Sequence, residues 1–225
     1  MQNFDIIKNN EIEKSYRVSR IMGDFDVKEE HISEHFKGKI EIPEKWQIGI
    51  IVGASGTGKT TIAKEIFGKK LYTPQSYIHK SVVDDMPKEC SMDEIEKMFY
   101  AVGFGSVPSW LKSYHVLSNG EKMRVDMARA LLENDFVVFD EFTSVVDRNV
   151  AEVASIAISN AVRNSNKKFV AVTCHYDVIE WLKPDWIFST DTMKTSFQQA
   201  HVPKNNLSLR NVGVTNGKNL GVITI

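Results

Sequence analysis

Apolar and polar residues follow patterns that predict short strands in the first part of the chain. Residues 15–27 and 35–42 show interrupted period-two alternation with β-branched and aromatic side chains, which is typical of antiparallel strands. Residues 46–52 form a nearly continuous apolar run that ends at Gly53, as expected for a buried parallel strand followed by a tight loop. We therefore expect a small antiparallel side sheet next to a buried core.

Strands and helices alternate along the rest of the chain. A helix is predicted over residues 59–67, where Gly68 ends it, and another over residues 91–102, where Ser91 and Glu94 form a capping box. The same patterns predict helices over residues 120–133 and 150–163 and strands over residues 136–139 and 168–174. This alternation indicates an α/β fold, with a mainly parallel sheet flanked by helices.

Composition is that of one ordinary globular domain and does not identify a partner. The chain has 225 residues, of which 42% are hydrophobic, and 28 basic side chains nearly balance 29 acidic ones. This balance gives no sign of a nucleic-acid groove, and no apolar run approaches the roughly 20 residues of a membrane-spanning helix. Cys90 and Cys174 fit neither a disulfide framework nor a metal site, and residues 1–10 lack the order of a secretion signal. We expect a cytoplasmic protein.

Residues 53–60 match the phosphate-loop pattern G-x-x-x-x-G-K-[ST]. The match stands between a predicted buried strand and a predicted helix, where such a loop directs backbone N–H groups and a helix N-terminus at phosphate oxygens. Lys59 is placed to reach the β- and γ-phosphates, and the Thr60 hydroxyl to bind Mg²⁺. The alternative, a chance glycine-rich turn, occurs in roughly one in a hundred chains of this length. The nucleotide-binding residues expected here are Gly53, Ala54, Ser55, Gly56, Thr57, Gly58, Lys59, Thr60 and Thr61.

Four further motifs follow the phosphate loop, which by itself leaves kinases, GTPases and other classes open. They are Leu117-Ser-Asn-Gly-Glu121 at the start of a predicted helix, Asp140-Glu141 after an apolar strand, Ser144-Val-Val-Asp147, and His175 after the next strand. In this order, over residues 46–189, the set resembles the signature motif, Walker B motif with catalytic Glu, D-loop and switch His of the ABC ATPase superfamily. The resemblance implies a P-loop NTPase fold of the ABC ATPase type with a small helical subdomain, and ATP and Mg²⁺ as ligands.

A closer similarity involves residues 108–121, 140–147 and 172–181. These stretches resemble soluble ABC-type ATPases that in some proteins are joined to a predicted acetyltransferase domain, for which this chain ends too soon after Trp186. We expect a single ATPase domain over residues 1–225. Its expected parts are an antiparallel β part at about 1–45, a core at 46–70 and 117–190, a reduced helical subdomain at 71–116 and a tail at 191–225.

The resemblance implies different tasks for two neighbouring acids. Asp140, at the mouth of a strand, would bind the hydration shell of Mg²⁺, while Glu141 would polarise the attacking water as general base. His175 would hydrogen-bond the γ-phosphate and hold the water and Glu141 in line. The plain alternatives are a strand that ends in solvated acids and a histidine with a structural contact.

The signature-like turn implies that one chain supplies half of each nucleotide site. By resemblance, Ser118 and Gly120 open a helix whose N-terminus faces the γ-phosphate bound by a second subunit, so that ATP would close a homodimer. Asn119 replaces the usual first Gly of the motif and tolerates left-handed backbone angles, while Glu121 replaces the usual Gln and changes its hydrogen bonding. The alternative is an ordinary Ser-capped helix.

Three further positions complete the expected site. Asp147, with Ser144, resembles the D-loop that crosses the dimer interface, although a plain turn would contain the same residue types. Gln75 resembles the Q-loop residue that contacts Mg²⁺. An aromatic residue from the predicted front sheet should stack on adenine, with Phe25 as the first candidate and Tyr16 as the second, and a place in the core is the alternative for either.

The short middle region favours a role outside transport. Lys59 and Ser118 are separated by 59 positions, which leaves little room for the groove in which transporter ATPases hold a membrane-domain helix. We expect ATP-driven dimerisation coupled to a soluble nucleic-acid or protein partner. The alternatives are the nucleotide-binding subunit of an ABC transporter and a small-molecule kinase, and the signature motif and His175 argue against a kinase. Residues 103–110 are expected to form either a docking surface or a packed loop.

Overall fold

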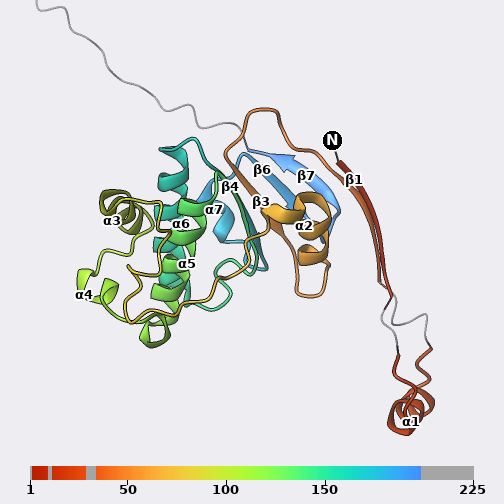
Figure 1. Ribbon diagram of the computed structural model, residues 1–225. Helices are drawn as coiled ribbons and strands as arrows, with labels where there is room; N and C mark the ends of the chain where they lie inside the picture. The colour runs from red at the N-terminus through yellow and green to blue at the C-terminus, as the bar shows by residue number, and fades with distance from the viewer. Residues whose placement is uncertain (1, 10–11, 29–33, 199–225) are drawn as a thin grey trace, which may run out of the picture.

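The computed structural model describes residues 2–9, 12–28 and 34–198, and its centre is a five-stranded sheet (Figure 1). The strands lie in the order β4-β5-β3-β6-β7 and are parallel except for β7, which pairs antiparallel with β6. Their bounds are β3 (Ile48–Val52), β4 (Phe136–Phe139), β5 (Lys168–Thr173), β6 (Trp186–Ser189) and β7 (Lys194–Phe197). The predicted mainly parallel α/β sheet is confirmed.

The central strand β3 is buried along its whole length, as its continuous apolar run predicted. Its one small residue, Gly49, lies beside the buried ring of Trp186 on β6. A Cβ atom at Gly49 would lie 2.1 Å from that ring, so the glycine makes room for the largest side chain of the core.

Different elements cover the two faces of the sheet. On one face, α2 (Lys59–Phe67) and the side sheet pack on a cluster that includes Ile51, Ile62 and Trp186. On the opposite face, the cluster around Ile50 and Phe169 continues into the helices on the left of Figure 1. These are α3 (Met92–Ala101), α4 (Val107–Trp110), α5 (Asn119–Glu133), α6 (Arg148–Arg163) and α7 (Val178–Leu182), with short 3₁₀ turns at Gly68–Lys70 and Tyr114–Val116.

An antiparallel side sheet is present, but one of its predicted strands is wrong. β1 (Gln2–Lys8) pairs with β2 (Glu34–Ile40), and Phe4 and Phe36 of this pair are buried in the core. The segment 15–27, predicted as a strand, contains the helix α1 (Tyr16–Asp24), and the Ser15 hydroxyl caps its N-terminus. The helical spacing of the apolar residues in this segment prevails over their broken alternation. These residues are Val18, Ile21, Met22 and Phe25.

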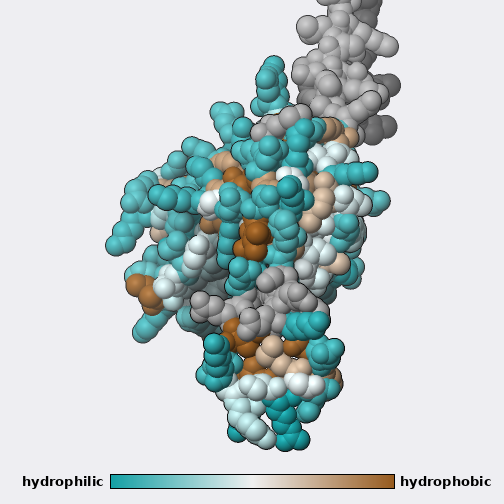
Figure 2. Space-filling view, turned by 90° about the vertical axis from the view of Figure 1, so that its right-hand side faces the viewer, coloured by the Kyte–Doolittle hydropathy of each residue, from teal (hydrophilic) through white to brown (hydrophobic). Residues whose placement is uncertain are grey.

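Helix α1 lies apart from the parallel sheet, beyond the far end of the β1–β2 pair (Figure 1). None of its residues is buried, and apolar side chains gather on this lower lobe of the molecule in Figure 2. Ile21 and Phe25 are 55% and 72% exposed. Neither Phe25 nor Tyr16 therefore belongs to the core.

The predicted helices that follow the phosphate loop are confirmed, with small changes at their starts. α3 begins after Ser91, and both halves of the capping box with Glu94 are present. α5 and α6 begin one and two residues earlier than predicted, because Ser118 and Asp147 cap them and the next residue is already helical.

The connector over residues 103–110 packs into the helical part through its aromatic residues. Phe104 and Trp110 are buried, and the Trp110 indole N–H donates to the Phe104 carbonyl at 2.7 Å. Val107 in the same connector is exposed. Of the two alternatives for this connector, the packed loop is therefore correct for Phe104 and Trp110. Of the predicted tail, β7 forms a strand, and residues 199–225 lie outside the described residues.

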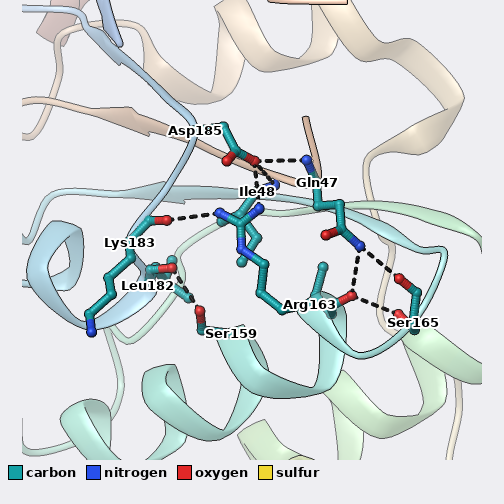
Figure 3. A network of polar contacts seen from close by, with 9 residues as sticks. Gln47, Ile48, Ser159, Arg163, Ser165, Leu182, Lys183 and Asp185 are labelled. Atoms are coloured by element: carbon teal, nitrogen blue, oxygen red, sulfur yellow. Dashed lines mark hydrogen bonds and ion pairs between the residues drawn. The ribbon is translucent and has the colours of Figure 1, made fainter. Parts of the chain in front are cut away.

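A network of polar contacts closes the amino end of the parallel sheet (Figure 3). The Asp185 carboxylate accepts hydrogen bonds from the backbone N–H groups of Gln47 and Ile48 at 2.8 and 2.9 Å and from Arg163 at 2.8 Å. Burial alone would raise the pKa of Asp185, but these hydrogen bonds hold it below its ordinary value. Because Ile48 begins β3 and Asp185 precedes β6, the network fixes these two strands relative to each other and to the end of α6.

Candidate nucleotide-binding site

The phosphate loop connects the carboxyl end of β3 to α2, as predicted. Gly56 and Gly58 both have φ of +82°, a conformation that glycine adopts at little cost. A Cβ atom at Gly58 would also lie 2.4 Å from the buried Phe36 ring. Gly58 is the N-cap of α2 and offers no side-chain cap, so the first N–H groups of the helix point into the loop and suit an anion.

The side chain of Lys59 lies across this loop. Its ammonium donates to the Ala54 carbonyl at 2.7 Å, and the Thr57 hydroxyl donates to the same carbonyl at 2.8 Å. Thr60 and Thr61 are half-buried in the first turn of α2, whereas Ser55 is exposed. The predicted nucleotide-binding residues of the loop are therefore gathered around one helix N-terminus.

Three residues beside the loop were missed by the sequence prediction. The Asp191 carboxylate accepts the Ala54 N–H at 3.0 Å and a hydrogen bond from the Tyr176 hydroxyl, and the Thr190 and Thr57 hydroxyls are 2.5 Å apart. The bonds from Tyr176 and Ala54 hold the pKa of Asp191 below its ordinary value, so the group is a carboxylate near neutral pH. No local motif marks Thr190 and Asp191, because the pairing of β6 with β3 brings them there, whereas Tyr176 follows β5, which pairs with β3 on the other side.

Asp140 and Glu141 follow β4, at the same end of the sheet as the phosphate loop. Asp140 is half-buried and accepts the Glu141 backbone N–H at 2.9 Å, while the Glu141 side chain is exposed. Glu141 has φ of +51°, a strained value for this residue type. The next residue, Phe142, is fully buried, and its N–H donates to the Val172 carbonyl of β5 at 2.9 Å. This anchor holds the strained turn in place.

His175 follows β5, between the strands that carry the phosphate loop and the acidic pair. Its Nδ1 lies 3.2 Å from the hydroxyl of Thr143, which is buried and has φ of +67°. Burial, together with the positive charge of Arg148, lowers the pKa of His175 below 6.5, so the ring is neutral at neutral pH. Because the Thr143 contact engages Nδ1, Nε2 is the nitrogen left to meet a ligand.

Asp147 is the N-cap of α6 and accepts the Val150 N–H at 3.0 Å. The following residue, Arg148, makes two hydrogen bonds to Asp177, one of them at 2.9 Å. This ion pair connects the start of α6 to the segment that follows His175. The residue after the D-loop candidate is thus in contact with a residue two positions after the switch-histidine candidate.

The signature candidate Ser118 lies at the N-terminus of α5. Its hydroxyl accepts the Glu121 N–H at 3.3 Å and donates to the Glu121 carboxylate at 2.9 Å, and the Ser118 N–H donates to that carboxylate at 3.0 Å. Hydrogen bonds from Ser109 and Ser118 lower the pKa of Glu121, so the carboxylate is charged near neutral pH. Glu in place of Gln therefore puts a negative charge at a helix end expected to face a phosphate.

The two residues between Ser118 and Glu121 are both helical. Asn119 has no positive φ, so its tolerance of left-handed angles is not used. Gly120 instead allows a close approach between helices, because a Cβ atom there would lie 2.7 Å from the Val150 side chain of α6.

The structure does not support the predicted adenine-stacking residue. Phe25 was chosen as part of a front strand, but it caps the C-terminus of α1, which Figure 1 shows far from α2. The fallback, Tyr16, lies on the same helix. The aromatic residue of the side sheet that does reach the loop is Phe36, which is buried under Gly58.

Gln75 lies in an exposed segment that continues past β4. The chain crosses the edge of the sheet at Leu71, which bridges Val138, and the Gln75 amide donates only a long 3.5 Å contact to the Thr73 carbonyl. No hydrogen bond between Gln75 and either Thr60 or Asp140 is present in the part of the chain that the structure describes. Its Mg²⁺ role stays a prediction.

Two curated proteins show how this chain is related by sequence, while no protein-family model matches it. The probable ATP-dependent transporter SufC of Escherichia coli (strain K12) is 31% identical over 71 residues, which cover 31% of this chain and 28% of that protein. The mitochondrial iron-sulfur clusters transporter ABCB7 of Oryzias latipes is 26% identical over 58% of this chain and 23% of that protein. The chain thus aligns with less than a third of the length of either relative.

Solved structures show the fold. A bacterial Atm1-family ABC exporter with ATP bound has a TM-score of 0.51 and 20% identity, and covers 69% of this chain and 34% of its own. The dimeric bacterial ABC transporter cassette MJ0796 has a TM-score of 0.51 and 16% identity, and covers 69% of this chain and 87% of its own. The fold is therefore that of a P-loop nucleotide-binding domain with a parallel sheet and an antiparallel side sheet.

The structural neighbours are ABC transporter proteins and the two sequence relatives are named as transporters, which supports the predicted resemblance to ABC ATPases. The predicted fold class is confirmed. The closer similarity to ATPases joined to an acetyltransferase domain stays a prediction. No helix in the described ranges is long and apolar enough to cross a membrane.

Proposed function

We propose that this chain binds ATP with Mg²⁺, hydrolyses it, and closes into a head-to-tail homodimer when ATP binds. The observation that carries the proposal is the convergence of three motifs at one end of the sheet. The phosphate loop, Glu141 and His175 follow β3, β4 and β5, which are neighbours in the order β4-β5-β3. The carboxyl end of parallel strands is where open α/β sheets bind ligands.

Triphosphate binding would use the phosphate loop in its present form. The uncapped N-terminus of α2 offers N–H groups to the phosphates, and the Lys59 ammonium would exchange the Ala54 carbonyl for phosphate oxygens. The Thr60 hydroxyl and the Asp140 carboxylate are oxygen donors of the kind that Mg²⁺ prefers, so this donor set fits the ion. When bound, Mg²⁺ would neutralise charge on the β- and γ-phosphates.

Hydrolysis needs a water held in line with the γ-phosphate. The exposed Glu141 carboxylate would accept a proton from that water as general base, in a position fixed by the buried Phe142. Neutral His175, oriented by Thr143 through Nδ1, would donate from Nε2 to a γ-phosphate oxygen. Both tasks are positioning, which is the main contribution of proteins to phosphoryl transfer.

The dimer follows from the place of Ser118, which lies on α5 and not among the residues gathered at the phosphate loop. Its helix N-terminus would complete the nucleotide site of a second copy. Two exposed apolar residues accompany the expected interface, since Val116 precedes Ser118 by two positions and is 69% exposed, and Val145 precedes Asp147 by two positions and is 64% exposed. Burial of these side chains would favour pairing.

Trapping the ATP-bound state tests this function. Glu141→Gln removes the general base and leaves the phosphate loop intact, so we expect ATP to bind without turnover and a dimer to accumulate. Size-exclusion chromatography with ATP and Mg²⁺ should show twice the monomer mass, with Glu152→Gln on the exposed side of α6 as the control that still turns over ATP. A Glu141→Gln protein that stays monomeric, or hydrolyses ATP like the parent, would contradict the proposal.

Mixing two inactive variants tests whether sites are shared between copies. Lys59→Ala and Ser118→Ala would each damage both sites of a homodimer. A mixed dimer would keep one undamaged site, in which Lys59 of the second variant meets Ser118 of the first. Random pairing leaves about a quarter of all sites undamaged, so partial recovery of ATPase activity is expected on mixing. No recovery, with both variants folded and able to pair, would refute the shared site.

We further propose that the ATP cycle drives a soluble protein or nucleic-acid partner, which the short middle region favours. The second candidate is the nucleotide-binding subunit of an ABC transporter, favoured by the names of both sequence relatives. Pull-down with the trapped Glu141→Gln protein separates them. An integral membrane protein among the captured partners would support the second candidate, and a soluble partner would support the first.

A further inference from the structure

A half-buried polar cluster outside the phosphate-loop region joins three segments of the helical part. Asp126 on α5 accepts a hydrogen bond from the Tyr77 hydroxyl at 2.8 Å and another from the Tyr114 hydroxyl at 2.7 Å. The two tyrosine rings are stacked in parallel, with centroids 3.8 Å apart. Each tyrosine thus contacts both the other tyrosine and the carboxylate, so the three side chains form one connected cluster.

Cations on α5 complete the cluster. The Arg129 guanidinium lies 5.2 Å from the Tyr77 ring centroid and donates to the Ser76 carbonyl at 3.3 Å, and the Lys122 ammonium lies 5.7 Å from the Tyr114 ring centroid. Burial raises the pKa of Asp126, while the tyrosine hydroxyls and the nearby cations act in the opposite direction. A half-buried carboxylate with two hydroxyl donors loses much if either donor leaves.

The sequence positions of these residues relate the cluster to the proposed site. Tyr77 follows Gln75 by two positions, Tyr114 precedes Ser118 by four, and Asp126 lies two turns along the helix that Ser118 caps. Between residues 73 and 80, all of which the structure describes, Tyr77 alone is buried. It is therefore the anchor of the exposed segment that carries Gln75.

We propose that Asp126, Tyr77 and Tyr114 are positioning residues that hold the Gln75 segment and the signature turn at Ser118 in one rigid unit. The inference rests on the proposed function, because it assigns the cluster to the placement of Ser118 against the nucleotide of a second copy. Without the cluster, the two segments keep only weaker ties, such as the 3.3 Å contact between His115 Nε2 and the Tyr77 carbonyl, so they are held less firmly and the shared site assembles poorly.

The test introduces Asp126→Asn into the Glu141→Gln protein. Asn has nearly the same shape, but it loses the charge and one acceptor position. We expect ATP affinity at a concentration too dilute for pairing to stay within twofold, while the ATP concentration that gives half-maximal dimer rises at least tenfold. Tyr114→Phe should give a smaller rise. Tyr100→Phe, which removes an exposed hydroxyl of α3, is the matched control and should give none.

Amide hydrogen exchange without nucleotide supplies the second measurement. Asp126→Asn should speed exchange in residues 76–80 and 112–118 together, because the cluster connects both segments. If Asp126→Asn dimerises at the same ATP concentration as its Glu141→Gln parent, or if only one segment exchanges faster, the inference is wrong. A parent that never dimerises refutes the proposed function instead, and the exchange result then still decides whether the cluster joins the segments.

Discussion

The amino and carboxyl ends of the parallel sheet are both lined with polar residues, but their contacts differ in kind. At the amino end, the Asp185 carboxylate receives three hydrogen bonds, and Arg163 and Gln47 also donate to backbone carbonyls (Figure 3). At the carboxyl end, Glu141 is exposed on a strained turn, and Lys59 bonds the carbonyl of its own loop. The polar groups of the amino end hold strands together, whereas Glu141 and Lys59 at the carboxyl end are the groups to which the proposed function assigns a ligand.

The largest expected effect is at the carboxyl end. Lys59→Ala should abolish measurable ATP binding and reduce hydrolysis at least about 100-fold, because it removes the cation that meets the phosphates. The free energy of unfolding should change by no more than about 0.5 kcal/mol, since the ammonium bonds only one loop carbonyl. Isothermal titration with ATP and urea denaturation measure the two quantities.

Lys64→Ala, an exposed lysine of the same helix, is the control for this variant. It should leave both ATP binding and stability unchanged. A Lys59→Ala protein that binds ATP as tightly as the parent would contradict the assignment of the carboxyl end to nucleotide binding.

At the amino end we expect a loss of stability without a loss of ATP binding. Asp185→Asn leaves the Arg163 guanidinium without its charged partner and weakens the bonds to β3, so the free energy of unfolding should fall by about 2 kcal/mol. ATP affinity, measured at a temperature where the variant is folded, should stay within about twofold because the change lies at the other end of the strands. Loss of ATP binding at unchanged stability would show that the contacts of Asp185 affect nucleotide binding at the opposite end of the sheet.

The pH dependence of stability tests the contribution of the Asp185 contacts. The folded pKa of Asp185 is lowered, so its contribution to stability is complete above the unfolded value of 3.8 and is lost as the pH falls through the folded value. The stability difference between the parent and Asp185→Asn should therefore shrink as the pH is lowered below 3.8. Urea denaturation at a series of pH values measures this difference. A difference that grows on acidification would contradict the assigned contacts.

The smallest expected effect comes from a comparison of two capping boxes that have nearly equal geometry. Ser91 and Glu94 cap α3 with the same three hydrogen bonds, at 2.8 to 3.4 Å, that Ser118 and Glu121 make on α5. Glu94→Gln and Glu121→Gln should each lower stability by about 0.5 kcal/mol. Only Glu121→Gln removes a negative charge that would face the γ-phosphate.

Glu121→Gln should therefore lower the ATP concentration needed for dimerisation by about threefold to tenfold. The measurement is the fraction of dimer against ATP concentration in the Glu141→Gln background. Equal behaviour of the two variants would mean that the box on α5 is only a helix cap, like the box on α3.

Local patterns were sufficient wherever neighbouring residues determine the structure. The buried run of β3, the glycines of the phosphate loop and the capping box at Ser91 and Glu94 can all be predicted from residue types within a few positions. Local patterns failed for residues 15–27, where two periodicities competed and the helical one prevailed. Phe25 was misplaced for the same reason, because its expected role depended on a strand.

The sequence by itself determined the α/β fold class, the phosphate loop and the order of the motifs along the strands, since each can be predicted from residue types at short spacing. Only the tertiary structure decided that Thr190 and Asp191 brace the phosphate loop, that Asp185 closes the amino end, and that Asp126 joins the segments of Gln75 and Ser118. These contacts join residues that are far apart in the chain. Their partners are set by which strands pair and which helices pack, and no local pattern encodes that choice.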